Sequence, residues 1–195
     1  ERRLCAVGSG WLSFSSPPDW LQALLAPRGY ALKDRVITYA RWGTAVAVGG
    51  DATVAVHHAL PEHVTGMAAV DAAAFEPFWQ LGRESLRRSL DEDNYVLVAI
   101  AGDTTVGYLV SDVWQERAHI VRLAVAPERQ GRGIGTRLIV HALRLMGEVG
   151  VREVTLNTQE TNVRSRALYA KLGFAPTGAT EEVWARALEP GCDED

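Results

Sequence analysis

The 195-residue chain lacks several features that would point to particular classes of protein. Its two cysteines, Cys5 and Cys192, are too few for a disulfide framework, so we expect free thiols in a reducing cytoplasm. No apolar run approaches the length of a membrane span, and the first residues lack the hydrophobic region of a signal peptide. The net charge of −4 argues against a nucleic-acid partner. These absences favour a cytoplasmic protein that binds neither membranes nor nucleic acids.

Hydrophobic residues make up 47% of the chain and charged residues 23%, which is typical of a folded domain with an ordinary core. The sequence does not begin with Met, which leaves a fragment or a processed form open. Glycines around position 50 indicate a boundary. We expect residues 51–189 to form the main domain and residues 190–195 to form an acidic tail.

Residues 1–50 contain a weak internal similarity. Residues 23–31 align with residues 167–175, so that Ala, Leu, Ala, Gly and Ala coincide and Tyr30 stands opposite Phe174. We interpret residues 1–50 as the tail of a second, degenerate copy of the same fold. A chance likeness between two alanine-rich helices is the alternative.

Hydrophobic periodicity and turn residues predict an α/β chain in which strands and helices alternate. In chain order, we expect a strand within 4–14, a helix from 19 to Gly29, an extended segment over 30–42, a strand over 52–59, helices over 61–75 and 82–90, a hairpin of strands 95–101 and 105–113, a strand over 118–125, a helix over 133–147, a strand over 153–157, a helix over 162–172, and one or two strands over 174–188.

The stretch from Val121 to Leu138 is the most informative part of the chain. A buried-strand pattern ends at Pro127, a glycine-rich basic loop follows, and an amphipathic helix then begins. Backbone N–H groups and a helix N-terminus at the end of a strand form a binding site for anions, above all phosphates.

Two familiar phosphate loops do not fit this stretch. A dinucleotide fold needs G-x-G-x-x-G directly after the strand and an acidic residue after the next one, whereas here residues 127–129 intervene and Asn157 ends the next strand. A nucleotide P-loop needs a Lys after its glycines, and none is present.

The stretch resembles the GCN5-related N-acetyltransferase (GNAT) superfamily. The signature [Q/R]-x-x-G-x-[G/A] is matched by Gln130, Gly133 and Gly135, after the usual apolar strand and Val-x-Pro-x-x-[Q/R]. Residues 162–174 resemble the late helix of that family, N-x-x-[AS]-x-x-L-Y-x-K-x-G-F. Over residues 52–188 the resemblance implies a mixed, mostly antiparallel sheet flanked by helices. It also implies that two central strands diverge to admit the cofactor, and that the helices over 133–147 and 162–172 lie on opposite sides of the sheet.

The resemblance further implies that acetyl-CoA is the co-substrate. The strand backbone would bind the pantetheine arm, the backbone N–H of Val125 would hold the oxyanion, and Tyr169 would protonate the departing thiolate. Asn162 is equally well explained as an N-cap, and Tyr169 could instead be a packing residue at the edge of the core. The residues expected to bind the cofactor are Leu123, Ala124, Val125, Gln130, Gly131, Arg132, Gly133, Gly135, Thr136 and Asn162.

The general base stays open among several side chains. The candidates are Glu76, Asp112, His119 and Glu160, besides water relays, and His119 is preferred as a base although a half-buried strand histidine needs no such role. A subfamily that acetylates the N-terminal alanine of a ribosomal protein resembles the late helix. It carries a carboxylate where this chain has Asn157, which weakens that assignment. We expect no metal site, because adjacent strand residues such as His57-His58 face opposite ways.

We therefore expect an N-acetyltransferase that acts on an amine of a protein or small molecule, in a possible homodimer. The acceptor would be selected by residues 75–82, by the hairpin near Trp114 and by the closing strands. A non-catalytic acyl-CoA sensor or interaction module is the alternative, and a dinucleotide-dependent oxidoreductase is a distant third.

Overall fold

The structure is a computed structural model that describes residues 10–91 and 94–188. Eight strands, five α-helices and four short 3-10 helices make up the regular elements of these residues. They are β1 (Trp11–Ser15), α1 (Asp19–Leu25), η1 (Ala26–Arg28), β2 (Ala31–Trp42), β3 (Ala55–His58), η2 (Pro61–His63), α2 (Val64–Ala74), η3 (Pro77–Trp79), α3 (Arg83–Asp91), β4 (Asn94–Ala101), β5 (Thr104–Trp114), β6 (Arg117–Val125), η4 (Pro127–Arg129), α4 (Ile134–Glu148), β7 (Glu153–Gln159), α5 (Val163–Lys171) and β8 (Ala175–Ala187).

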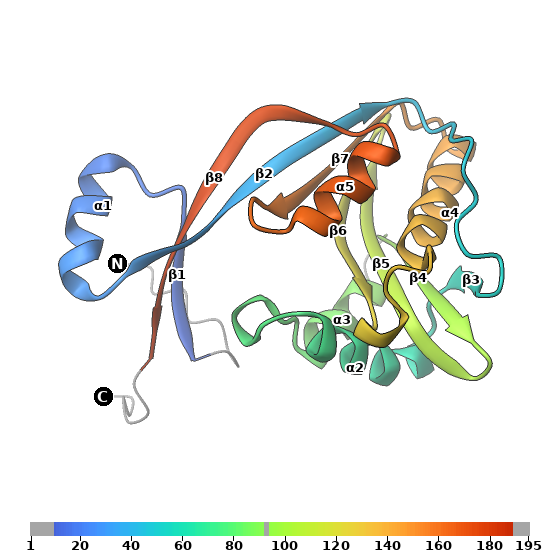
Figure 1. Ribbon diagram of the computed structural model, residues 1–195, viewed down its shortest axis with the longest axis horizontal. Coiled ribbons are helices and arrows are strands. Elements are labelled where there is room, and N and C mark those ends of the chain that lie inside the picture. The colour runs from blue at the N-terminus through green and yellow to red at the C-terminus, as the bar shows by residue number, and fades with distance from the viewer. Residues whose placement is uncertain (1–9, 92–93, 189–195) are drawn as a thin grey trace.

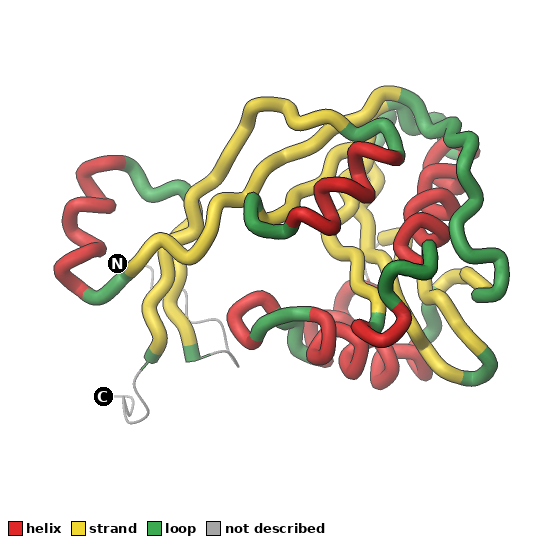
Figure 2. The backbone as a smooth tube through the Cα atoms, in the orientation of Figure 1, coloured by secondary structure: helices red, strands yellow, loops and turns green. Residues whose placement is uncertain are grey.

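The eight strands form a single sheet in the order β1-β8-β2-β7-β6-β5-β4-β3. Neighbouring strands are antiparallel except β6 and β7, which are parallel. Figure 1 shows β2 and β8 extending together from the rest of the sheet towards β1 and α1, and Figure 2 traces the same strands as a continuous layer. The expected mixed, mostly antiparallel sheet flanked by helices is confirmed.

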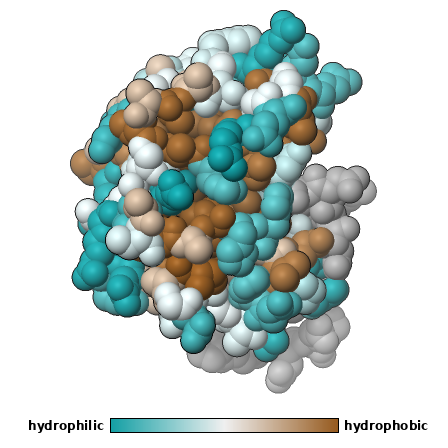
Figure 3. Space-filling view, turned by 90° about the vertical axis from the view of Figure 1, so that its right-hand side faces the viewer, coloured by the Kyte–Doolittle hydropathy of each residue, from teal (hydrophilic) through white to brown (hydrophobic). Residues whose placement is uncertain are grey.

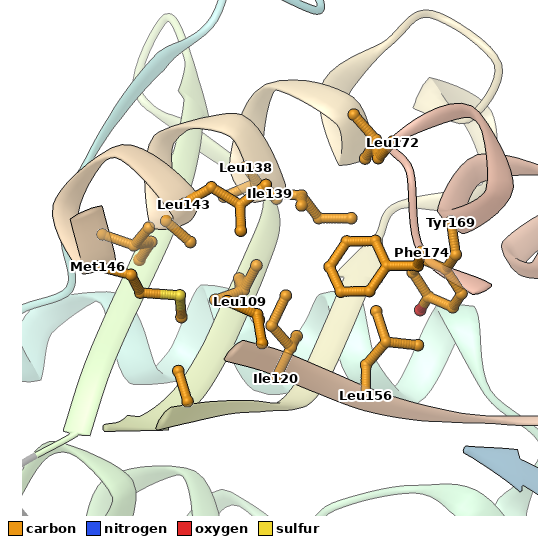
Figure 4. Close-up of a cluster of buried hydrophobic side chains, with 14 of the residues drawn as sticks. Leu109, Ile120, Leu138, Ile139, Leu143, Met146, Leu156, Tyr169, Leu172 and Phe174 are labelled. Atoms are coloured by element: carbon orange, nitrogen blue, oxygen red, sulfur yellow. The ribbon is translucent and has the colours of Figure 1, made fainter. Parts of the chain in front are cut away.

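Two hydrophobic clusters cover opposite faces of the sheet. The larger one joins β5, β6 and β7 to α4 and α5, and Figure 4 shows Leu143 of α4, Tyr169 of α5 and Leu172, which follows α5, in this same cluster. The second cluster packs Met67 of α2 and Leu86 of α3 against β4 and β5. The expectation that the helices over 133–147 and 162–172 lie on opposite sides is therefore wrong. The far face is already covered by α2 and α3, and the apolar sides of α4 and α5 share one core.

The periodicity that predicted α4 corresponds to its buried side. Residues three or four apart on this helix turn the same way, which places an apolar stripe against the sheet. The buried apolar residues of this stripe are Ile134, Leu138, Ile139, Ala142, Leu143 and Met146.

Most element predictions are confirmed to within a few residues, including the 95–113 hairpin and the left-handed Gly29 and Gly173. The strand expected over 52–59 is shorter, because the Asp51 side chain accepts hydrogen bonds from the backbone and hydroxyl of Thr53 and holds the chain in a turn. The closing segment is one strand, β8. Cys5, Cys192, the 190–195 tail and the first part of the strand expected within 4–14 lie outside the described residues.

Residues 43–54 form a linker that runs beside α4. The backbone N–H of Asp51 donates to the Gly133 carbonyl at 3.2 Å, and Thr44 lies next to Gly147 near the other end of the helix. Figure 3 views the molecule from this side and shows hydrophobic side chains in the middle of the view with hydrophilic ones around them. The linker thus carries the chain from β2 to β3 along the outside of α4.

β1 and β2 complete the same sheet as the strands that follow the linker. β2 pairs with β7 from Val36 to Trp42 and with β8 on its other edge. The division of the chain into residues 1–50 and 51–189, and the origin of residues 1–50 in a second copy, stay predictions.

Candidate active site

The site lies where β6 and β7 separate. The described register pairs Arg117–Ile120 of β6 with Glu153–Leu156 of β7 and goes no further. β6 continues to Val125 with β5 on its other edge. The expected divergence of two central strands is therefore present, and it leaves one edge of residues 121–125 facing a gap.

Hydrogen bonds at the end of β6 show which backbone groups face this gap. The N–H of Ala126 donates to the Val106 carbonyl on the β5 side at 2.9 Å. N–H groups alternate in direction along a strand, so the N–H of Val125 points the other way, towards the gap. The Val125 carbonyl also points there, since it accepts from Nε2 of Gln130 at 2.9 Å. Val125 consequently offers the gap a backbone donor.

The loop after β6 leads directly into the N-terminus of α4. Gly133 caps the helix in the left-handed region (φ 88°) and has no side chain to satisfy the first N–H groups. In a 15-residue helix these groups and the helix dipole create a positive end. The geometry suits an anion, as the sequence predicted.

The linker holds this loop from behind. A Cβ built on Gly50 would lie 2.4 Å from the backbone nitrogen of Arg137 and 2.7 Å from the Gly133 carbonyl oxygen. Gly50 also has a φ of 71°. Only glycine allows this close approach, so the segment that the sequence indicated as a boundary also supports the anion loop.

A pocket of about 470 Å³ joins the open edge of β6 to this loop and to α5. Every expected cofactor residue except Arg132 lines it, while the side chain of Arg132 is exposed elsewhere on the loop. The full lining is Ala74, Phe75, Leu123, Ala124, Val125, Gln130, Gly131, Gly133, Ile134, Gly135, Thr136, Asn162, Arg164, Ser165, Ala167, Leu168 and Lys171.

Sequence reasoning missed part of this lining. Arg164, Leu168 and Lys171 stand four and three residues apart, so they share a side of α5 that faces the pocket. Arg164 and Lys171 add positive charge beside the helix end, which suits a phosphate-bearing ligand. The 164–168–171 spacing could have indicated them, and Phe75 is the first residue of the 75–82 segment expected to select the acceptor.

Gln130 links two walls of the pocket. Its amide nitrogen donates to the Val125 carbonyl, and its amide oxygen accepts from Nη1 of Arg164. A side chain with both a donor and an acceptor is needed for this arrangement. Gln130 therefore connects β6 to α5 at the mouth of the gap.

Asn162 caps α5. Its side-chain oxygen accepts from the backbone N–H of Ser165 at 3.0 Å, so the N-cap interpretation is confirmed. Asn162 also lines the pocket, which leaves its side chain next to any ligand bound there.

Tyr169 lies beside the pocket rather than in its lining. Its ring is 6% exposed and packs between Tyr39 and Phe174, with ring centroids 6.2 and 6.1 Å away. Figure 4 shows it in the core next to Phe174 and Leu156. Ser165, four residues before it, does line the pocket, and burial raises the pKa of Tyr169 to about 12. The phenol is therefore fully protonated at neutral pH.

His119 is fixed in one orientation on β6, immediately before the strands separate. Its Nδ1 lies 2.8 Å from the Thr155 hydroxyl, which itself donates to the Ala118 carbonyl. Donation of the Thr155 hydroxyl proton to the Ala118 carbonyl would place the ring proton of His119 on Nδ1 and leave Nε2 its lone pair. Burial lowers the pKa of His119, although Asp112 acts in the opposite direction. The neutral imidazole is the form a general base requires.

A buried ion pair connects β6 to the loop before α3. The Asp71 carboxylate, fully buried at the end of α2, accepts from Arg122 at 2.6 Å and from the Tyr108 hydroxyl at 2.5 Å. It also accepts from the backbone N–H of Leu81 at 2.6 Å. Burial raises the pKa of Tyr108 far above its ordinary value, so its hydroxyl stays a donor.

Arg122 extends this network to the pocket wall. Its guanidinium lies 3.5 Å from the ring centroid of Phe75 and donates to the Trp79 carbonyl at 2.7 Å. The loop between α2 and α3 and strand β6 are thus held together by one charge pair.

We expect Asp71→Asn to lower the free energy of unfolding by about 3 kcal/mol, because it leaves the Arg122 guanidinium buried without a counter-charge. Urea denaturation measures this. Glu84→Gln is the matched control, since it removes an exposed ion pair with Arg87 and should leave the urea concentration at the unfolding midpoint unchanged. Equal, small effects of the two substitutions would contradict the assigned importance of Asp71.

The open strand edge and the helix N-terminus together form a pocket that suits an extended, anionic ligand. The sequence profile of the Acetyltransferase (GNAT) family matches residues 64–174, from α2 to the end of the α5 region. The chain belongs to this family, whose domain is an acyltransferase that uses acetyl-CoA.

Individual relatives agree with this placement. The chain is 41% identical over 58 residues to N-alpha-acetyltransferase MAK3 of Arabidopsis thaliana, a match that covers 30% of each chain. It is 27% identical over 126 residues to a putative [ribosomal protein bS18]-alanine N-acetyltransferase of Bacillus subtilis, covering 64% of this chain and 82% of the relative.

The solved structure of PaiA N-acetyltransferase from Thermoplasma acidophilum, in complex with coenzyme A, has the same fold. It superimposes with a TM-score of 0.60 at 18% identity and covers 69% of this chain and 98% of that one.

Among the described residues, no cluster of His, Cys, Asp or Glu could hold a metal ion. No described helix has the length and hydrophobicity to cross a bilayer.

Proposed function

We propose that the chain is an acetyl-CoA-dependent N-acetyltransferase that transfers an acetyl group by direct attack of an amine of a small molecule or a protein. One observation carries this proposal: the unpaired edge of β6 and the N-terminus of α4 open into one pocket. A thioester carbonyl and a diphosphate are the two groups of acetyl-CoA that need such donors. The enzyme would act in the cytoplasm.

The pocket residues fit this substrate. Ile134, Gly135 and Thr136 supply N–H groups at the helix end, where the diphosphate would bind, with Arg164 and Lys171 close by. The pantetheine arm would extend along Leu123 to Val125 as an added strand. The N–H of Val125 would then donate to the thioester oxygen as negative charge develops on it.

The reaction needs no reagent other than acetyl-CoA and the amine. The neutral amine nitrogen forms a bond to the thioester carbon, the C–S bond breaks, and the thiolate leaves. His119 takes the proton that the amine loses, and Tyr169 gives one to the sulfur. Glu76 and Glu160 are already paired with Lys33 and Arg35, which favours His119 over these two candidates for the base.

Replacing Tyr169 by Phe tests the acid. The variant keeps the ring that packs against Phe174 and loses only the hydroxyl, so we expect kcat to fall by about 10²–10⁴-fold while acetyl-CoA affinity stays unchanged. Steady-state kinetics and calorimetry measure the two quantities. Tyr39→Phe is the matched control, because that neighbouring buried hydroxyl only accepts from Arg166. Full activity of Tyr169→Phe would exclude the role.

Replacing His119 by Gln tests the base. A base with a lowered pKa works when deprotonated, so kcat/KM of the wild type, expressed per neutral amine, should rise through a pKa below about 6.5 and then level off. His119→Gln should lower the plateau and remove this acidic limb. His141→Gln is the control, since burial also lowers the pKa of His141 on the outer side of α4. An unchanged limb in His119→Gln would rule this base out.

A non-catalytic acyl-CoA sensor is the second candidate, and the burial of Tyr169 outside the pocket lining favours it. Thiol release from acetyl-CoA across a panel of amines and peptides separates the two functions. Turnover above the uncatalysed rate supports the enzyme, and tight binding with no turnover supports the sensor.

A further inference from the structure

A cation lies beside two aromatic rings that contact each other, where β1 and β2 reach the loop after α2. Nζ of Lys33 lies 3.0 Å from the Glu76 carboxylate and 5.8 Å from the ring centroids of both Trp11 and Phe78. The two rings meet edge to face, with centroids 5.5 Å apart and planes at 80°. A carboxylate with aromatic faces is the usual protein environment for an organic ammonium group.

This cluster is accessible from solvent. The Glu76 side chain is 70% exposed and that of Lys33 is 30% exposed, whereas both rings are half-buried. An exposed pair of this kind contributes little to stability, so holding the fold together does not by itself account for it. Trp79 packs edge to face on Phe78 at 4.6 Å and keeps that ring in place.

The cluster also adjoins the wall of the pocket. Glu76 follows Phe75, which lines the pocket and stacks on Arg122. The loop that carries Glu76 and Phe78 is held by Arg122 through the Trp79 carbonyl and by Asp71 through the N–H of Leu81. The carboxylate is therefore carried by a loop with two buried anchors, one residue after Phe75 of the pocket wall.

We propose that Glu76, Trp11 and Phe78 form a subsite for a cationic group of the acceptor, and that Lys33 occupies it in the free protein. This proposal rests on the acetyltransferase function proposed above. The attacking amine must be neutral, so a subsite that favours an ammonium ion binds a second, non-reacting amine. The acceptor class is an amine that carries a further ammonium group.

Exchange of Lys33 for the acceptor needs no rearrangement of the backbone. Its ammonium sits on a flexible four-carbon stem and can move into solvent when another cation takes its place. Lys33 therefore competes with the acceptor within the same molecule, and its removal should improve binding of a dication while leaving a monocation unaffected.

Paired acceptors test the subsite on the full chain. The probes are diamines and the monoamines of equal chain length, such as 1,4-diaminobutane and n-butylamine, with acetyl-CoA saturating. Glu76→Gln should raise KM for the diamine by about tenfold, with kcat and the monoamine KM unchanged. Lys33→Met should lower the diamine KM by about threefold. Glu148→Gln, which breaks a comparable exposed ion pair with Arg144, should change neither the diamine KM nor the monoamine KM.

The outcomes separate the subsite from the catalytic function. Equal effects of Glu76→Gln on both members of each pair, or a wild type that does not prefer diamines, would overturn the subsite while leaving the acetyltransferase intact. A wild type that binds acetyl-CoA and acetylates no amine in the panel would overturn the proposed function and the acceptor subsite with it. Thermal midpoints and acetyl-CoA affinities of all variants show whether any change reflects folding.

Discussion

The end of hydrogen bonding between β6 and β7, at the Ile120–Leu156 pair, is the constraint on which the site depends. Beyond it β6 keeps β5 on one edge and presents ordered backbone groups to a pocket on the other. A strand edge is normally a place where another chain can pair. Here α5 and the Gln130 side chain flank the edge, so the pocket has room for an extended ligand but not for another sheet.

The strands on both sides keep this open edge in place. β7 leaves β6 but pairs with β2 from Glu153 to Gln159, so the diverging strand is itself fully supported. β6 is held on its other side by β5 and by the buried contact of Arg122 with Asp71. The N-terminal strands therefore have a structural role in the site, and they also bring Trp11 and Lys33 to the loop that carries Glu76 and Phe78.

The sequence predicted the parts of the site that depend on local chemistry. Glycines at fixed spacing, the helix after them and the Asn162 cap are set by backbone conformation and nearby hydrogen bonds, so the residues themselves reveal them. The position of β2 between β7 and β8, the common face of α4 and α5, and the contact of Lys33 with Glu76 depend on pairings across the chain. No local pattern in the sequence indicates such pairings. Tyr169 shows the same limit: its spacing from Asn162 was clear, but its packing against Tyr39 was not.

Amide hydrogen exchange at Leu123 and Val125 tests the central claim most directly, because these N–H groups face the gap and lack a partner strand there. Addition of acetyl-CoA should slow exchange at both positions, with Val125 protected by the thioester oxygen and Leu123 by the pantetheine arm. The amide of Leu109, in the central strand β5, is the internal control and should stay slow throughout. Saturating acetyl-CoA that leaves exchange at Leu123 and Val125 unchanged would contradict the account.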